Sequence, residues 1–269
     1  MRLTPASHTS DYTGVMKREP RILGVIPARL GSTRLPGKVL RTLAGRPMVE
    51  WVWRAAVKSK LMAEVVVATD SEQVVDLCRA LNIPFVMTSP HCASGSDRVH
   101  LVSQQMDADI YVNIQGDEPL LTAEHFAPLL DLFQPDKIPG GAEVSVATLA
   151  VACPAEDVHN PNAVKVVTAL DGRALYFSRS AIPLDRDGRG FSGYRKHLGI
   201  YAYRKAALER FAALPPSPLE QVERLEQLRL LENGIAIYVA EAHGDTIGVD
   251  TEDDLRRAES LLLARNNCP

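Results

Sequence analysis

The segment RILGVIPARLGSTRLPGK (residues 21–38) contains the two features on which the fold prediction depends. Its opening RILGVI is a continuous apolar run, which is typical of a strand buried on both faces of a parallel sheet. A loop follows that contains glycine, hydroxyl groups and the cations Arg29, Arg34 and Lys38. Because ligands of such sheets bind beyond the carboxyl ends of the strands, we expect this loop to lie at a ligand site.

The spacing of the loop glycines excludes a Walker A motif. Gly31 and Gly37 are separated by five residues where that motif requires four, and Val39 follows Lys38 where Ser or Thr is required. The backbone N–H groups after Gly31 can still form a concave anion site with the three cations, and such a site suits a triphosphate. The alternative is an exposed basic loop with solvated charges, and the loop alone leaves both interpretations open.

Apolar and amphipathic segments alternate along the rest of the first half of the chain. We expect strands at 64–69, 83–87 and 109–114, and helices at 47–59, 71–81 and 122–133. This alternation predicts an α/β protein in which a mostly parallel central sheet has helices on both faces, as in Rossmann-like folds.

The second half has shorter connections between its predicted elements. We expect strands at 143–151, 163–169, 173–177, 194–203, 235–240 and 246–249, and helices at 217–233 and 251–264. The prediction is one domain over residues 21–269 with a smaller mixed-sheet subdomain at about 143–235. The polar N-terminal extension, residues 1–20, is expected to be disordered.

Composition excludes several classes of partner. Lys+Arg 30 against Asp+Glu 33 gives a net charge of −3, so no global basic field exists to attract nucleic acid. No apolar run reaches the roughly 18 residues of a membrane helix, so membrane insertion is not expected. The four cysteines form no C-x-x-C pair, which favours reduced thiols in a cytoplasmic protein.

Two acidic segments follow predicted strands. Asp117 lies in NIQGDEP (residues 113–119), and Asp250 directly precedes a predicted helix. One or two carboxylates together with substrate phosphates are the usual ligands of Mg²⁺, so Asp117 suits that ion. An acidic turn is the alternative for Asp117, although the flanking Gly116 and Pro119 modestly favour a shaped loop. Asp250 alone fits a favourable charge at a helix start.

Other polar positions point to a second ligand. Ser94 and Asp97 have the spacing of a capping box, and Arg98 beside them is a candidate contact to a nucleotide or a sugar. Strand alternation places His197, Tyr201 and Tyr203 on one face. With Arg179, His197 would clamp an acidic substrate, and Tyr201 would line its pocket. Glu226 and Gln227 flank an apolar helical stripe and would reach sugar hydroxyls. A solvated strand face and an ordinary helix start are the alternatives.

Taken together, these segments resemble one family over residues 21–264. The motifs in chain order are PARLGSTRLPGK, ATDSE, SGSDR, NIQGDEP, NPNAVKVV, ALYFSRSAIP, KHLGIYAYR, SPLEQVERLEQLR and GVDTEDDL. The series resembles the 3-deoxy-manno-octulosonate (KDO) cytidylyltransferases, or CMP-KDO synthetases. The resemblance implies a nucleotide-diphospho-sugar transferase fold, a homodimer and Mg²⁺. It also implies formation of CMP-KDO and pyrophosphate from CTP and KDO, for lipopolysaccharide biosynthesis.

The resemblance also assigns expected roles to residues of this sequence. It implies triphosphate binding by Arg29, Ser32, Arg34 and Lys38. It implies cytidine contacts at Ala28, Ser94, Gln115 and Gly116. The metal ligands would be Asp117 and Asp250, and both would be catalytic together with Arg29 and Lys38. The KDO-binding set would be Arg179, His197, Tyr201, Glu226 and Gln227.

Three alternatives remain from the sequence. A related CMP-sialate synthetase also has a basic N-terminal loop, although NIQGDEP and KHLGIYAY fit the KDO enzymes better, and an 8-amino-KDO enzyme is hard to distinguish. A non-catalytic nucleotide-binding module would have lost an acidic metal ligand, but Asp117 and Asp250 are both present. A NAD-dependent dehydrogenase is disfavoured because G-x-G-x-x-G is absent.

Overall fold

The computed structural model describes residues 18–31 and 34–266 of the chain. The first seventeen residues of the predicted N-terminal extension lie outside this part, as does Ser32, a predicted triphosphate contact.

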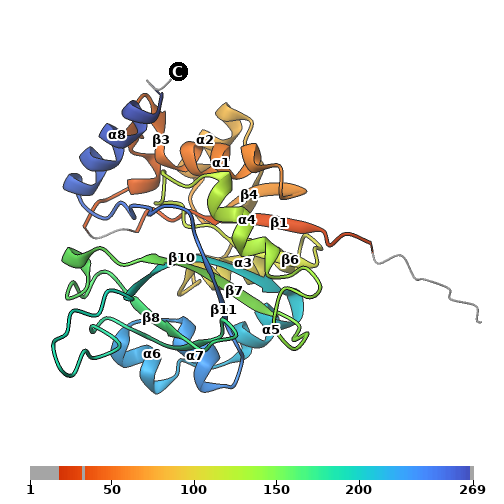
Figure 1. Cartoon of the computed structure of the whole chain (residues 1–269). Helices are drawn as coiled ribbons and strands as arrows, with labels where there is room; N and C mark the ends of the chain where they lie inside the picture. The colour runs from red at the N-terminus through yellow and green to blue at the C-terminus, as the bar shows by residue number, and fades with distance from the viewer. Residues whose placement is uncertain (1–17, 32–33, 267–269) are drawn as a thin grey trace, which may run out of the picture.

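One mixed sheet runs through the described part of the chain and contains nine strands (Figure 1). The strand order is β11-β7-β10-β6-β1-β4-β5, and β8 joins the sheet by pairing with both β10 and β9. The strands are β1 (Ile22–Pro27), β4 (Glu64–Thr69), β5 (Phe85–Met87), β6 (Ile110–Asn113), β7 (Val146–Ala152), β8 (Lys165–Thr168), β9 (Ala174–Ser178), β10 (Arg195–Arg204) and β11 (Tyr238–Glu241).

The first half of the sheet is parallel. β1 lies between β4 and β6 and is parallel to both, and β5 continues the parallel order beyond β4. These strands are continuous apolar runs because they are covered on both faces, which is the property from which they were predicted. β4 matches the predicted strand residue for residue. The predicted α/β fold class is confirmed.

The second half extends the same sheet. β10 pairs antiparallel with β6 and with β7, and β11 is parallel to β7. A register shift interrupts the β10–β7 ladder between Leu198 and Tyr201, so a bulge lies beside the predicted sugar residues. The mixed part therefore shares backbone hydrogen bonds with the parallel part.

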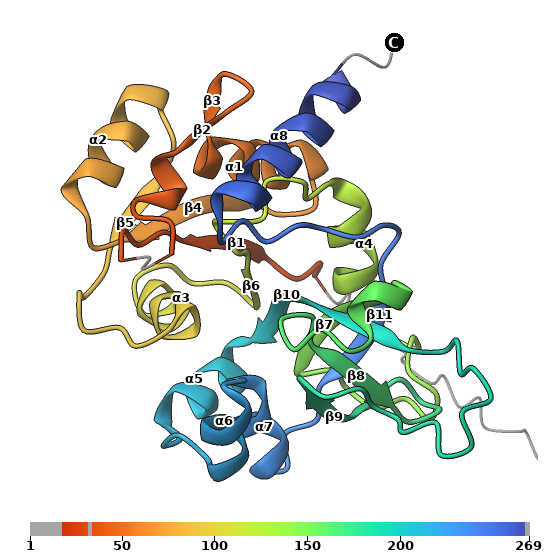
Figure 2. The ribbon, with the colours of Figure 1, turned by 90° about the vertical axis from the view of Figure 1, so that its left-hand side faces the viewer.

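Helices cover both faces of the sheet (Figure 2). One side carries α1 (Met48–Ser59), α2 (Glu72–Leu81), α4 (Ala123–Asp131) and α8 (Glu252–Asn266). The other side carries α3 (Gly95–Ser103), α5 (Lys205–Ala213), α6 (Pro218–Glu223) and α7 (Gln227–Glu232). Short elements complete the fold: η1 (Lys38–Leu40), β2 (Thr42–Leu43), β3 (Arg46–Pro47) and η2 (Ala155–Asp157). Within the described residues, no helix has the length and apolar character needed to cross a bilayer.

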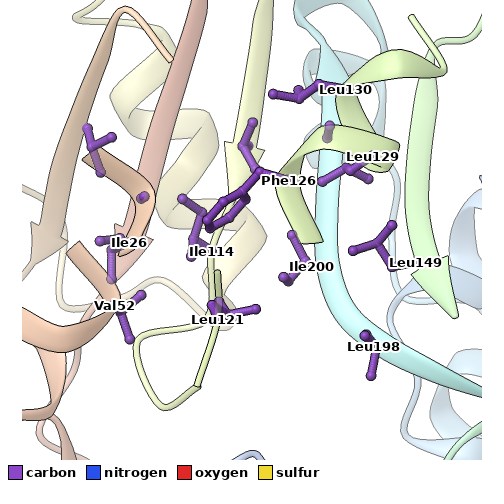
Figure 3. Close-up of a cluster of buried hydrophobic side chains, with 14 of the residues drawn as sticks. Ile26, Val52, Ile114, Leu121, Phe126, Leu129, Leu130, Leu149, Leu198 and Ile200 are labelled. Atoms are coloured by element: carbon purple, nitrogen blue, oxygen red, sulfur yellow. The ribbon is translucent and has the colours of Figure 1, made fainter. Parts of the chain in front are cut away.

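Each face of the sheet has its own apolar core. Ile26, Val52 and Phe126 belong to the cluster under α1 and α4, which also includes Ile114 and Ile200 (Figure 3). A second cluster, under α3 and α5, packs alternate residues of the same strands against the two helices. The strand residues include Leu23, Val25, Tyr111 and Tyr203, and the helices contribute Val99 and Leu208. Because successive residues of a strand face opposite sides, continuous apolar runs are needed to fill both cores.

Two predicted elements differ from the structure, and one helix of the structure was not predicted. The helix expected at 217–233 is two helices, because Arg224 ends α6 with a left-handed backbone (φ 55°). Residues 246–249 do not form a strand, although Val249 N–H donates to Asp117 O (2.9 Å). Helix α5 was not predicted, because it follows β10 directly and its N-cap residue, Arg204, makes no side-chain cap.

Candidate active site

A cavity of about 450 Å³ opens where β1 and β6 end. Pro27 and Asn113, the last residues of these two strands, line it, and it extends past the start of α3 to the junction of α6 and α7. It lies at the position expected for ligands of a parallel sheet, beyond the carboxyl ends of the strands.

Lys38 joins the two predicted metal aspartates at one end of this cavity. Its ammonium donates hydrogen bonds to a carboxylate oxygen of Asp117 and to Oδ1 of Asp250, the latter at 2.9 Å. Arg34 adds an ion pair to the other Asp250 oxygen (2.7 Å). Gly37 precedes Lys38 with φ 63°, a conformation in which glycine carries no steric penalty, and this turn begins η1. Thus the opening loop and two distant acidic segments form one cluster of charges.

The charges of this cluster raise the pKa of Lys38. Burial acts to lower the pKa of Lys38, but attraction and hydrogen bonds from Asp117 and Asp250 outweigh burial and raise it. Lys38 is therefore a fixed positive charge at neutral pH. Arg29 lines the same cavity. It forms no ion pair with any described residue, so its guanidinium is available to an anion.

Two carboxylates that share one ammonium fit a small hard cation. Their oxygens converge on a single positive centre, and anionic oxygen is the donor that Mg²⁺ prefers. In the described part of the chain, no group of three or more His, Cys, Asp or Glu side chains forms a metal cage. The donor set therefore fits an ion that takes its remaining ligands from phosphate and water.

The segment that carries Asp250 is fastened to the turn that carries Asp117. Val249 N–H donates to Asp117 O (2.9 Å), and the hydroxyl of Thr246 donates to Glu118 Oε2 (2.8 Å). Glu118 is buried, and burial together with the charge of Asp117 raises the pKa of Glu118 to about 7. These contacts fix the relative position of the two aspartates.

Gly116 allows this turn to approach the end of β1. A Cβ atom at Gly116 would lie 2.9 Å from Pro27 O, which is closer than a side chain tolerates. Gln115 spans the cavity floor, since its Nε2 donates to Gly199 O (3.2 Å). Both residues line the cavity, as predicted for nucleotide contacts.

The N-terminus of α3 forms another wall. Ser94 and Asp97 make the predicted capping box. The guanidinium of Arg98 lines the cavity but is held by Asp70 Oδ2 (3.0 Å) and Thr88 Oγ1 (2.6 Å). Because its donors are engaged, Arg98 shapes the wall more than it offers a free charge.

A row of rings from β10 also lines the cavity. The ring centroids of His197 and Tyr201 are 5.4 Å apart, and those of Tyr201 and Tyr203 are 5.8 Å apart. His197 Nε2 lies 3.0 Å from Thr148 Oγ1, whose hydroxyl hydrogen is donated to Ile200 O at 2.7 Å. Nε2 must therefore donate, which leaves Nδ1 as an acceptor. Burial lowers the pKa of His197 to about 3, so the ring is neutral at physiological pH.

The junction of α6 and α7 supplies the last wall. Glu226 and Gln227 line the cavity together with Arg224. Burial raises the pKa of Glu226, and a hydrogen bond from Ser94 acts in the opposite direction. Ser94 was predicted to contact the nucleotide and Glu226 the sugar, so the two predicted subsites adjoin.

Three buried polar atoms of the cavity wall have no hydrogen-bond partner among the described residues. They are Asn113 Oδ1, Tyr201 Oη and Gln227 Nε2. Buried polar groups are almost always paired in native proteins, so three unpaired atoms around one cavity indicate a polar ligand.

Most predicted site residues line this single cavity. They are Arg29, Arg34, Lys38, Ser94, Arg98, Gln115, Gly116, Asp117, His197, Tyr201, Glu226, Gln227 and Asp250. Two predicted contacts do not. Ala28 is fully buried, and its N–H donates to Ala68 O (2.8 Å). Arg179 donates to the main-chain oxygens of Pro161, Glu223 and Arg224, so in this structure it braces the α6–α7 junction. Its direct contact with a sugar stays a prediction.

Several cavity residues were not predicted. They are Ser96, Asn113, Gly199, Tyr203, Phe211 and Arg224. Asn113 carried a usable signal, because it is a polar residue at the end of an otherwise apolar strand. Arg224 carried none, because its place depends on a helix break that the sequence pattern does not show.

The fold and the cavity define a class of protein. A parallel sheet with cations and paired carboxylates at its strand ends is the arrangement of an α/β enzyme acting on a phosphorylated nucleotide. Residues 23–237 match the family model described as cytidylyltransferase. The chain belongs to this family.

Individual relatives share most of the chain. The 3-deoxy-manno-octulosonate cytidylyltransferase of Acidobacterium capsulatum is 64% identical over 244 residues, covering 91% of this chain and 97% of its own. The protein of that name from Koribacter versatilis is 54% identical over 254 residues, covering 94% of this chain and 93% of its own. Their similarity agrees with the resemblance seen in the sequence motifs.

Solved structures agree with the fold. The structure of CMP:2-keto-3-deoxy-manno-octonic acid synthetase complexed with CTP has a TM-score of 0.85 and 41% identity, covering 91% of this chain and 99% of its own. The 4-diphosphocytidyl-2C-methyl-D-erythritol synthase of Anaerococcus prevotii has a TM-score of 0.61 at 14% identity, covering 90% of this chain and 98% of its own. The second likeness concerns the fold alone.

Proposed function

We propose that this protein activates KDO for lipopolysaccharide biosynthesis by transferring CMP from CTP to the sugar, with release of pyrophosphate. The observation that carries the proposal is the single cavity in which cations, paired carboxylates and unpaired polar atoms meet. The chain's membership of the cytidylyltransferase family and the names of its relatives support the choice of nucleotide and sugar.

The reaction is an in-line displacement at the α-phosphorus of CTP. The anomeric hydroxyl of the sugar attacks, its proton is lost to solvent, the new P–O bond forms and the bond to pyrophosphate breaks. Such transfers depend on positioning and charge neutralisation more than on covalent catalysis. Arg29, Arg34 and Lys38 have the charge and the position to bind the phosphates and to stabilise the negative charge that develops on pyrophosphate.

We assign Asp117 and Asp250 as the residues that would hold Mg²⁺. When bound there, the ion would supply charge neutralisation at the phosphate and lower the pKa of a nearby hydroxyl. In the structure the ammonium of Lys38 pairs with both carboxylates. We infer that CTP draws this ammonium toward its phosphates, which frees the aspartate oxygens.

The sugar side of the cavity differs in chemistry from the phosphate side. His197 is neutral and Glu226 offers a carboxyl. Tyr201 Oη and Gln227 Nε2 have no hydrogen-bond partner in the part of the chain that the structure describes. Hydroxyl-rich ligands need such a mixture of donors and acceptors. We therefore place KDO between β10 and the α6–α7 junction, with Ser94 near the boundary to CTP.

The direct test is a pyrophosphate-release assay with CTP, Mg²⁺ and a panel of acidic sugars. We expect release with KDO. Strong preference for 8-amino-KDO or sialic acid would replace the substrate assignment with one of the two related CMP-sugar activities. No release with any acidic sugar would refute catalysis.

We further propose that two copies of the chain form a homodimer. Strand β9 pairs only with β8 among the described strands, and α7 packs against it. Leu175 on this edge strand is 60% exposed, and Leu170 and Leu184 on either side of β9 are more exposed still. An apolar edge strand favours pairing with another chain. A cytoplasmic location is part of the same proposal, because CTP is a cytoplasmic substrate.

A further inference from the structure

Asn113 lines the cavity at the end of a strand that pairs with two others. It is the last residue of β6, directly opposite Tyr201 on β10 and Val25 on β1. Only 2% of its surface is exposed, and it lines the cavity. The apolar residues before it fill the core, so a polar residue here needs a separate explanation.

The side chain of Asn113 is only half satisfied by the protein. Its Nδ2 makes a long contact of 3.5 Å with Ser96 Oγ, and its Oδ1 has no partner among the described residues. A buried carbonyl oxygen without a hydrogen bond is costly, and native proteins retain one where a ligand or water completes it. A donor supplied by a ligand in the cavity would satisfy Oδ1.

The neighbours of Asn113 indicate what kind of ligand this is. Tyr201 is its direct cross-strand partner, and side chains at such positions lie about 5 Å apart on the same face. Within the described part of the chain, the hydroxyl of Tyr201 is also unpaired, and so is Nε2 of Gln227, which lines the same cavity. The unpaired set thus combines an acceptor, a group that can do both, and a donor. Adjacent hydroxyl groups of a carbohydrate offer the matching set.

We propose that Asn113 is a specificity-determining residue whose Oδ1 accepts a hydrogen bond from a hydroxyl group of the acceptor sugar. The proposal rests on the proposed function and deepens its sugar side. Asn113 belongs to the sugar side because its partner Tyr201 continues into the ring row that ends at His197. A sugar that lacks the matching hydroxyl would leave Oδ1 unpaired again, so the residue selects against that sugar.

The ribose of CTP also carries hydroxyl groups, so the test separates the two sources. KM is measured for KDO and for CTP in the wild type and in Asn113→Leu, which removes both polar atoms at similar size. We expect KM for KDO to rise at least about tenfold, with KM for CTP within about twofold of the wild type. Asn113→Asp keeps an oxygen at the Oδ1 position and should restore most of the loss for KDO.

A second measurement changes the ligand. KDO analogues that each lack one hydroxyl are compared in the wild type and in Asn113→Leu. For the wild type, one analogue should have a higher KM than KDO, by about the factor by which Asn113→Leu raises KM for KDO. In the variant, that analogue and KDO should have the same KM. Calorimetric binding of CTP shows whether Asn113→Leu is folded. If it is not, Asn113→Ser is used instead, because the shorter serine side chain no longer places an acceptor at the position of Oδ1.

Three results would overturn the inference. The first is an unchanged KM for KDO in Asn113→Leu, and the second is that every analogue has the same KM ratio to KDO in the variant as in the wild type. The third is that the variant loses only the discrimination between CTP and 2′-deoxy-CTP, which would make Asn113 a ribose contact. A wild type without pyrophosphate release from CTP and KDO would instead refute the proposed function. The two failures are therefore distinguishable.

Discussion

Asp117 and Asp250, which belong to segments far apart in the sequence, bind the same ammonium group, that of Lys38. The backbone continues this relationship, because Val249 N–H donates to Asp117 O (2.9 Å). A lysine that occupies the point between two carboxylates holds the place of a cation until a ligand with stronger negative charge arrives. The first two predictions depend on this arrangement.

Replacement of either aspartate by asparagine should remove most of the turnover. Asp117→Asn and Asp250→Asn each take one anionic oxygen from the pair, and loss of comparable charge stabilisation in enzymes costs about 10²–10³-fold in kcat. Pyrophosphate release at saturating CTP measures the effect. Asp253→Asn is the matched control, because Asp253 lies nearby on α8 and, among residues 18–31 and 34–266, pairs only with exposed Arg256. Near-wild-type kcat in either aspartate variant would refute the two-aspartate metal site.

Removal of the lysine charge should make the aspartate pair a better cation site in the absence of nucleotide. Lys38→Met leaves the two carboxylates without their ammonium, so Mn²⁺ no longer competes with it, and we expect Mn²⁺ affinity to rise at least about tenfold. Electron paramagnetic resonance of free Mn²⁺ measures this without any turnover. Lys38→Arg keeps the charge and should bind Mn²⁺ as weakly as the wild type. Equal affinities in all three proteins would show that the ammonium does not compete with the ion.

The parallel half of the fold could be predicted because its signals are local. Continuous apolar runs such as Glu64–Thr69 become buried strands, and Ser94 with Asp97 starts a helix as its spacing indicates. The break at Arg224 could not be predicted, since a left-handed arginine is unfavourable by itself and is held there by tertiary contacts. Arg179 supplies one of them, by donating to Arg224 O.

The position of a site residue could be predicted from the sequence where that residue directly follows a strand of the parallel sheet. Asp117 follows β6, so the rule for parallel sheets places it at the ligand edge. Asp250 follows no strand in the structure and was assigned through the family resemblance. Asn113 is a polar residue at the end of an otherwise apolar strand, a signal that the sequence prediction did not use, and its unpaired oxygen is visible only in three dimensions.

His197 should make the protein sensitive to acid. Burial lowers the pKa of His197 to about 3, whereas an unfolded histidine titrates near 6.5. Between these values the unfolded state binds one proton more, so the free energy of unfolding falls as pH falls through this window. From pH 6.5 to pH 4.5 this one group should remove about 2–3 kcal/mol.

Urea unfolding of the wild type and of His197→Gln at both pH values checks this expectation. The glutamine can still donate to Thr148 Oγ1 but does not titrate, so its stability should decline less with acid. His91→Gln replaces an exposed ring and should keep the wild-type slope. A variant at residue 197 with the same slope as the wild type would contradict a neutral buried His197.

The hydroxyl of Thr246 should contribute measurably to stability. It donates to the buried carboxyl of Glu118 (2.8 Å), so Thr246→Val leaves that group without this bond at nearly the same volume. We expect a loss of about 1–2 kcal/mol in the free energy of unfolding, and a smaller loss in Thr246→Ser, which keeps the donor. Chemical denaturation at pH 7 compares the three proteins. Equal stability of the valine and serine variants would show that the bond is not needed to hold the Asp250 segment.

A single charge on β9 should separate the proposed dimer. Leu175 is 60% exposed on this edge strand, so Leu175→Glu would bury an unpaired carboxylate if two copies meet there, and an uncompensated charge in an interface is strongly unfavourable. Light scattering after size exclusion should give twice 29.4 kDa for the wild type and 29.4 kDa for the variant. Leu61→Glu changes a 38% exposed leucine after α1 and should leave the dimer intact. A monomeric wild type would refute the dimer. If Leu175→Glu remained dimeric, the two copies would have to meet on another surface.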